Sequence, residues 1–113
     1  MEYRQITDEY AVAPQIAAGD VAAVKAAGFR SIICNRPDAE HPGEASTADE
    51  VRQAAEAAGL AFRYIPVISG QITHENVEDQ AAALADLPTP VFAYCRSGAR
   101  CTNLHALVQQ FKG

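Results

Sequence analysis

The chain has 113 residues, of which 49% are hydrophobic and 20% charged, so it can bury the core of one domain spanning residues 1–113. Its formal net charge of −5 argues against a nucleic acid or an anionic membrane surface as the main partner. No apolar run approaches the roughly 20 residues of a membrane span, and the first residues lack the apolar region of a signal peptide. Three widely spaced cysteines do not make a disulfide framework, so we expect a cytoplasmic protein with reduced thiols.

Hydrophobic spacing and breaker residues predict strands and helices that alternate along the chain. The first segment, 3–12, is expected to form a β-hairpin that turns at Asp8 and Glu9. Gly28 is a typical helix stop, and Thr47 with Glu50 forms a capping box. The expected helices cover 19–27, 48–58, 74–86 and a C-terminal segment around 104–111, and the expected strands cover 29–34, 61–67 and 91–95. This alternation predicts an α/β fold with a mostly parallel sheet and right-handed crossovers.

The segment from Val91 to Thr102 carries the strongest functional signal. A β-type strand ends at Cys95, a loop with one glycine follows, and helical spacing then begins. Such a turn points backbone N–H groups and a helix N-terminus at one spot, which makes an anion site. These groups and the adjacent Arg96 and Arg100 can lower a cysteine pKa from about 8.5 to roughly 3.5–7.5, which makes Cys95 a candidate thiolate nucleophile. The alternative is an inert cysteine buried at a strand end.

Polar loops follow two other expected strands. Cys34 and Arg36 lie in the loop after the strand 29–34, where open parallel sheets place their sites, and Ser69 and Gln71 follow the strand 61–67. Arg36 is either a second positively charged side chain of the anion site or part of an ordinary turn. Because the carboxyl ends of parallel strands share one edge, we expect these loops to converge on Cys95. His41 and His74 are expected to face solvent, and His105 to be partly buried.

Three blocks of the sequence resemble the phosphatase-like domain family of β-lactamase hydrolase-like proteins, also known as the DUF442 or sulfur transferase group. They are Phe29-Arg-Ser-Ile-Ile-Cys-Asn-Arg-Pro-Asp38, Ile65-Pro-Val-Ile-Ser-Gly-Gln-Ile-Thr73 and Tyr94-Cys-Arg-Ser-Gly-Ala-Arg100. The resemblance implies the fold of cysteine-dependent protein tyrosine and dual-specificity phosphatases, with a parallel sheet between helices and a loop that cradles an oxyanion.

Two departures from the phosphatase pattern favour sulfur chemistry. Phosphatases of this type use Cys-x5-Arg, whereas this loop reads Cys-x4-Arg, with Arg100 one place early and Cys101 where the arginine would stand. The shorter form resembles the loop of rhodanese-type sulfurtransferases. The related phosphatases also carry an acidic residue on the loop after the preceding strand, and residues 67–71 contain none. Sulfur transfer needs no strong general acid, because sulfite leaves readily.

Two further thiols could resolve an oxidised or persulfidated Cys95. Cys101 stands where relatives often place Ser or Thr, and Cys34 stands where some phosphatases of this fold keep a second cysteine. The alternative is that Cys101 replaces a hydroxyl and Cys34 packs in the core. The cysteines and His105 do not have the spacing of a zinc site, and we expect neither a metal nor another cofactor.

The expected function is therefore a sulfurtransferase in which Cys95 takes up sulfur as a persulfide and Arg100 holds the donor. The expected anion-binding loop also uses Arg96, Ser97, Gly98, Ala99, Arg36 and Gln71. The expected partners are a small anionic sulfur donor and a thiol acceptor. A sulfur-oxidising enzyme is a further candidate partner, because relatives are fused to such domains. Two alternatives stay open: a phosphatase that forms a phosphocysteine, and a non-catalytic thiol sensor.

Overall fold

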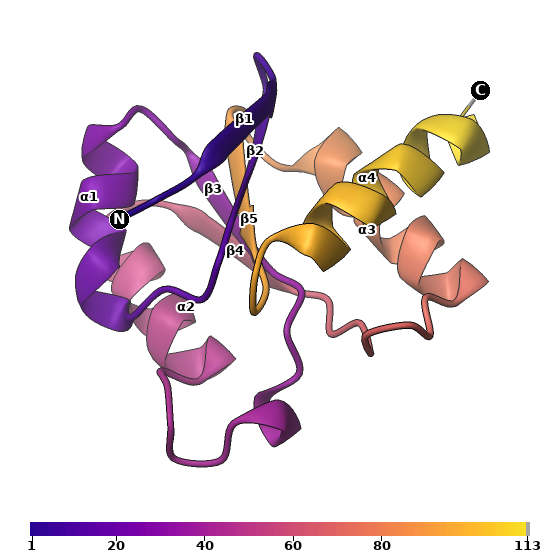
Figure 1. Ribbon diagram of the computed structural model, residues 1–113. Helices are drawn as coiled ribbons and strands as arrows, with labels where there is room; N and C mark the ends of the chain where they lie inside the picture. Colours follow the sequence, from indigo (N-terminus) through magenta and orange to yellow (C-terminus); the bar gives the residue numbers. More distant parts are fainter. Residues whose placement is uncertain (113) are drawn as a thin grey trace.

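A computed structural model describes residues 1–112. These residues form five strands, four α-helices and two short 3-10 helices, whose arrangement Figure 1 shows. In chain order these are β1 (Arg4–Thr7), β2 (Tyr10–Ala13), η1 (Ala18–Asp20), α1 (Val21–Ala26), β3 (Ser31–Cys34), η2 (Asp38–Glu40), α2 (Ala48–Ala57), β4 (Ala61–Tyr64), α3 (His74–Asp86), β5 (Val91–Tyr94) and α4 (Ala99–Lys112). No helix in this part of the chain is both long and apolar enough to cross a membrane.

The strands form one sheet in the order β1-β2-β5-β3-β4. Strands β2, β5, β3 and β4 pair in parallel, and only β1 is antiparallel, as the second arm of the hairpin. The predicted α/β fold with a mostly parallel sheet and an N-terminal hairpin is confirmed. The carboxyl ends of β3, β4 and β5 therefore meet at one edge, where this class of sheet places its sites.

Alternate residues of each central strand face opposite sides of the sheet, because side chains along a strand have a period of two. Ile32 and Phe92 contribute to a cluster with α1 and α2, whereas Ile33 and Val91 contribute to a cluster with α3 and α4. Figure 1 shows the same arrangement, with α1 and α2 on one face and α3 and α4 on the other. All four residues of β3 and of β5 are buried, as expected of strands covered on both faces.

Several element boundaries differ from the prediction. The strand expected over 61–67 ends at Tyr64, because Pro66 has no N–H group to continue a ladder. Ile65 and Val67 still donate to the Cys34 and Asn35 carbonyls, at 2.9 and 3.0 Å, so the segment stays against β3. The helix expected over 19–27 is instead η1 followed by the shorter α1. The expected Thr47 cap is present at α2, and Thr73 caps α3 in the same way.

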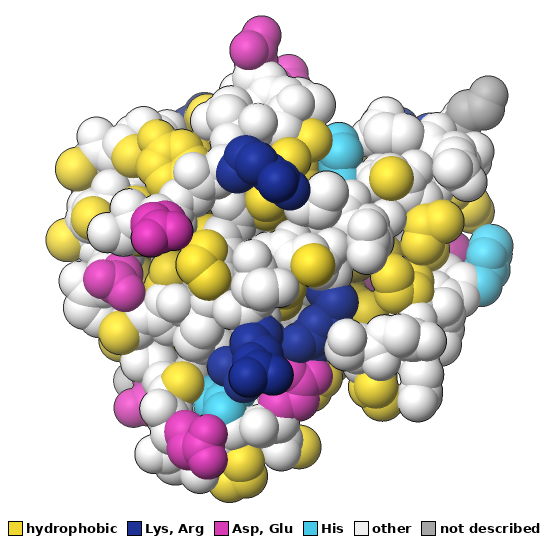
Figure 2. Space-filling model, in the orientation of Figure 1, with side chains coloured by type: hydrophobic (Ala, Val, Ile, Leu, Met, Phe, Trp, Pro, Cys, Tyr) yellow, Lys and Arg dark blue, Asp and Glu magenta, His cyan; other side chains and the backbone are white. Residues whose placement is uncertain are grey.

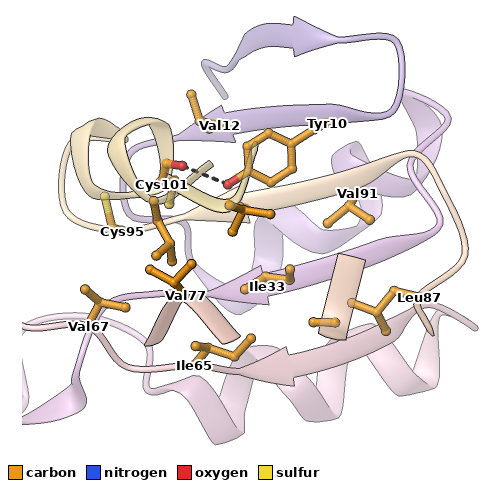
Figure 3. Packing of buried hydrophobic residues seen from close by; sticks show 14 residues of the cluster. Tyr10, Val12, Ile33, Ile65, Val67, Val77, Leu87, Val91, Cys95 and Cys101 are labelled. Carbon is orange, nitrogen blue, oxygen red and sulfur yellow. Dashed lines mark hydrogen bonds between the residues drawn. The ribbon is translucent and has the colours of Figure 1, made fainter. Parts of the chain in front are cut away.

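A buried polar network joins the sheet to the two helices on one face. The Asn35 side-chain amide donates to Gln80 Oε1 at 3.0 Å, and Gln80 Nε2 donates to the Tyr10 hydroxyl at 3.4 Å. The Tyr10 hydroxyl in turn donates to the Cys101 carbonyl at 3.0 Å, as Figure 3 shows. Because buried polar groups need partners, this network fixes the first turn of α4 relative to β2 and α3.

Candidate active site

Cys95 follows β5 directly, at the start of the loop that leads into α4. Its backbone N–H donates to the Ala13 carbonyl at 3.2 Å, and the Gly98 N–H donates to Cys95 Sγ at 3.1 Å. Gly98 has a φ of +91°, a conformation in which glycine avoids the strain of a side chain. The loop therefore folds back so that its own backbone N–H groups face the sulfur.

These contacts make Cys95 acidic. The neighbouring Cys101 thiol and the backbone N–H groups of Cys101, Ser97 and Gly98 lower its pKa to about 5, against the opposing effect of burial. Figure 3 shows Cys95 and Cys101 at the same end of the buried cluster. At neutral pH Cys95 is therefore a thiolate, which is the nucleophilic form.

Arg100 lies in the first turn of α4 and is held in one orientation. Its Nη1 and Nη2 donate to the two carboxylate oxygens of Glu40 at 2.6 and 2.9 Å, and Nη1 also donates to the Val67 carbonyl at 2.9 Å. A guanidinium group has five N–H donors. These bonds use three of them and leave Nε–H and one Nη2–H free, which together form a side-on fork that suits an oxyanion.

Glu40 is the residue that sequence reasoning missed. It ends η2 and accepts a 3.1 Å bond from Arg36 Nε in addition to the pair with Arg100. The hydrogen bonds from Arg100, first of all, and from Arg36 lower the pKa of Glu40, so its carboxylate is ionised. The only sequence signal was its position four residues after Arg36, because the contact with Arg100 spans 60 residues of chain.

An open cleft of about 730 Å³ lies beside the Cys95 loop. It brings together most of the predicted basic and hydroxyl side chains, and in Figure 2 dark blue side chains gather around it. Its lining residues are Arg36, Glu40, Glu44, Ser69, Arg96, Ser97, Ala99 and Arg100. Gln71 does not line the cleft but lies exposed in the loop before α3. The residue of that loop that lines the cleft is Ser69.

The two other cysteines differ in how they are placed relative to Cys95. Cys101 is fully buried beside Cys95, and burial raises the pKa of its thiol. Cys34 is buried at the end of β3, where its thiol donates to the Arg36 carbonyl at 3.4 Å and burial raises its pKa to about 11. Both are free thiols. Of the two, Cys101 is the one placed to influence the nucleophile.

The three histidines lie outside this chemistry. His41 was expected to face solvent, but it is only 3% exposed. His105 is buried and stacks on Tyr10, with ring centroids 4.3 Å apart, whereas His74 is exposed as expected. Within residues 1–112, no three or more His, Cys, Asp or Glu side chains are grouped to hold a metal ion.

Comparison with known proteins assigns the fold and the loop to a family. The model of the phosphatase-like domain of β-lactamase hydrolase-like protein matches residues 2–112. The chain belongs to this family. The β-lactamase hydrolase-like protein of Agrobacterium fabrum is 34% identical over 113 residues, which are 100% of this chain but only 26% of that relative. The chain therefore spans about a quarter of that relative's length.

Solved structures place this phosphatase-like domain among cysteine-dependent phosphatase folds. A protein of Neisseria meningitidis, provisionally named a phosphatase, is 30% identical, with a TM-score of 0.85 over 97% of this chain and 78% of that one. The phosphatase Tk-PTP, at 18% identity, covers 86% of this chain and 62% of its own with a TM-score of 0.66, which shows a shared fold alone. The predicted resemblance is confirmed, and the protein is a phosphatase-like domain whose reaction these likenesses leave open.

The cleft contains acidic residues that come from outside the loop 67–71. Residues 67–71 indeed contain none, but Glu40 and Glu44 reach the same cleft from the segment after β3. Glu40 is ionised by its arginines and cannot donate a proton in this arrangement. Glu40 therefore does not supply the acid that residues 67–71 lack.

Proposed function

We propose that this phosphatase-like domain hydrolyses small phosphate monoesters through a phosphocysteine on Cys95. The observation that carries the proposal is a cysteine of pKa about 5 whose loop borders a cleft lined by Arg36, Arg96 and Arg100. Guanidinium forks bind phosphate oxygens in pairs, and several together match the charge of a phosphate dianion. The likeness to structures of phosphatases supports the same chemistry.

In the proposed reaction each group of the site has one step. The Cys95 thiolate attacks phosphorus while the bond from phosphorus to the leaving oxygen breaks, and the free fork of Arg100 holds two phosphoryl oxygens. Water then attacks the phosphocysteine, the P–S bond breaks, and phosphate leaves with the Cys95 thiolate restored. Glu40 touches Arg100 and Arg36 rather than the reacting atoms, so its role is to position both guanidinium groups.

The cleft favours leaving groups that depart as anions. An acid that protonates the leaving oxygen contributes roughly 10²–10⁴-fold to such reactions, and the one carboxylate paired with the site arginines, Glu40, is ionised. Aryl phosphates should therefore react faster than alkyl phosphates, because a phenolate needs less help from an acid.

The proposed nucleophile is a cysteine that must stay reduced, and this requirement suits a cytoplasmic setting.

Sulfur transfer is the second candidate, and two observations favour it. The loop keeps the short Cys-x4-Arg spacing, and a second thiol, Cys101, lies beside the nucleophile. In this reaction the Cys95 thiolate attacks the outer sulfur of thiosulfate, the S–S bond breaks and sulfite leaves. A thiolate or cyanide acceptor then takes the sulfur from the Cys95 persulfide.

One parallel experiment separates the two reactions. Purified protein is given para-nitrophenyl phosphate in one assay, and thiosulfate with cyanide in the other, with Cys95→Ser as the matched control for both. We expect Cys95-dependent release of para-nitrophenol. Cys95-dependent thiocyanate without phosphate release would overturn the phosphatase proposal in favour of sulfur transfer, and activity that survives in Cys95→Ser would overturn both.

A further inference from the structure

A second hollow borders the Cys95 loop in addition to the cleft. It has a volume of about 570 Å³, and Arg96, Ser97 and Ala99 line both it and the cleft. The rest of its lining comes from Gly98 of the same loop, from residues 2–4, and from residues 12–14 at the end of β2. A ligand held over Cys95 could therefore extend across the loop into this hollow.

Two arginines give this second hollow its charge. Arg4 Nη2 donates to Thr102 Oγ1 at 3.1 Å, and the Thr102 hydroxyl donates to the Gly98 carbonyl at 2.9 Å, so Arg4 is tethered to the loop. Within residues 1–112, neither Arg4 nor Arg96 forms an ion pair with a carboxylate, whereas Arg36 and Arg100 both pair with Glu40. Figure 2 shows basic side chains both over the β1–β2 hairpin and around the loop.

We infer that the second hollow is an anion subsite, and that the preferred substrate is a small molecule with two oxyanion groups. One group lies over Cys95, and the other lies against Arg4 and Arg96. This inference rests on the proposed function for the first group, and it adds the substrate class. Glu2 is the one acidic residue that lines the second hollow, so its carboxylate weakens the subsite without abolishing the excess of positive charge.

The subsite is tested by binding, which does not depend on turnover. Calorimetric titration of the wild-type chain compares alkane bisphosphonates of increasing chain length with the matching alkyl monophosphonates. Neither kind of ligand has a phosphate ester bond, so neither is hydrolysed during the titration. We expect the best bisphosphonate to bind about 10-fold more tightly than its monophosphonate, from one or two partly exposed charge-assisted contacts. This ratio should fall to about 2-fold in Arg4→Ala and rise in Glu2→Gln.

Arg30→Ala is the matched control, because it removes the same charge from a different hollow, which Lys25 and Gly59 also line. It should leave the ratio at its wild-type value. A ratio near 1 at every chain length, or a ratio that persists in Arg4→Ala, would overturn the subsite. The proposed function fails separately, if para-nitrophenyl phosphate is not hydrolysed while bisphosphonate binding still depends on Arg4.

Discussion

At the scale of single residues, two side chains orient or charge the residue beside them. Glu40 occupies the end of the Arg100 guanidinium and leaves its side-on fork free, and Cys101 supports the charge of Cys95. Neither residue needs to touch a substrate to affect the reaction. Both effects can be separated from folding, because conservative variants keep the size of each side chain.

Replacing Glu40 with Gln should reduce catalysis by misorienting Arg100. Gln keeps one acceptor oxygen but loses the ionised two-oxygen contact, which is the stronger kind of hydrogen bond. We expect kcat/KM for para-nitrophenyl phosphate to fall about 10-fold, with most of the loss in KM, and the pH profile of Cys95 alkylation to keep its shape. Glu44→Gln removes a carboxylate of the same cleft that makes no ion pair in residues 1–112, and it should change kcat/KM less than about 2-fold. Higher activity in Glu40→Gln would instead mean that Glu40 competes with the substrate.

Removing the Cys101 thiol should make Cys95 less acidic. The pKa of Cys95 is about 5, and the Cys101 side chain is the largest cause that lowers it. The iodoacetamide reaction of the wild type should therefore fall off only as the pH drops through about 5. In Cys101→Ala the fall-off should move up toward the ordinary cysteine pKa of about 8.5, and Cys101→Ser, which keeps a donor, should lie between the two. An unchanged profile in Cys101→Ala would leave the backbone N–H groups as the sole cause.

At the scale of elements, the sequence signals were most informative where a local pattern determines the structure. The capping box at Thr47 correctly marked the start of α2, because a cap depends only on residues three positions away. The 39–46 segment has no such periodicity, so neither η2 nor the burial of His41 could be predicted. The loop from Cys95 to Gly98 was partly predictable. Its glycine could be read from the sequence, but the hydrogen-bond partners of its backbone could not.

Gly98→Ala and Gly59→Ala should lose similar amounts of stability, but only Gly98→Ala should also lose activity. Both glycines have positive φ, +91° and +82°, so each substitution costs about 1–2 kcal/mol of stability from backbone strain. A Cβ on Gly98 would meet the Ala13 backbone at 3.5 Å, an ordinary contact, so strain dominates there as well. Only Gly98→Ala should also lose kcat/KM, about 10-fold or more, because relief of the strain at this φ moves the N–H that donates to Cys95 Sγ. Denaturant unfolding and phosphatase assays of both variants check this, and equal activities would contradict the role of the loop.

At the scale of the whole molecule, the parallel sheet brings three distant segments to one edge. The prediction that loops after β3, β4 and β5 converge holds for Arg36, Ser69 and Arg96, which line one cleft, because strand order alone places these loops together. The choice of side chain within each loop did not follow from topology: Ser69 rather than Gln71 faces the cleft. The pairing of Glu40 with Arg100 was invisible for the same reason, since it depends on how a nonperiodic segment packs.

The buried network that joins the sheet to α4 gives a test at this scale. Tyr10→Phe removes the hydroxyl that donates to the Cys101 carbonyl and accepts from Gln80, and both groups stay buried. Leaving such groups without a partner costs about 1–3 kcal/mol, so the free energy of unfolding should fall by that amount. Tyr64→Phe is the control: its hydroxyl accepts from the Asp38 N–H, but the residue is 42% exposed and water can replace it, so the loss should stay below about 0.5 kcal/mol. Equal losses in urea unfolding would mean that the network does not hold α4 against the sheet.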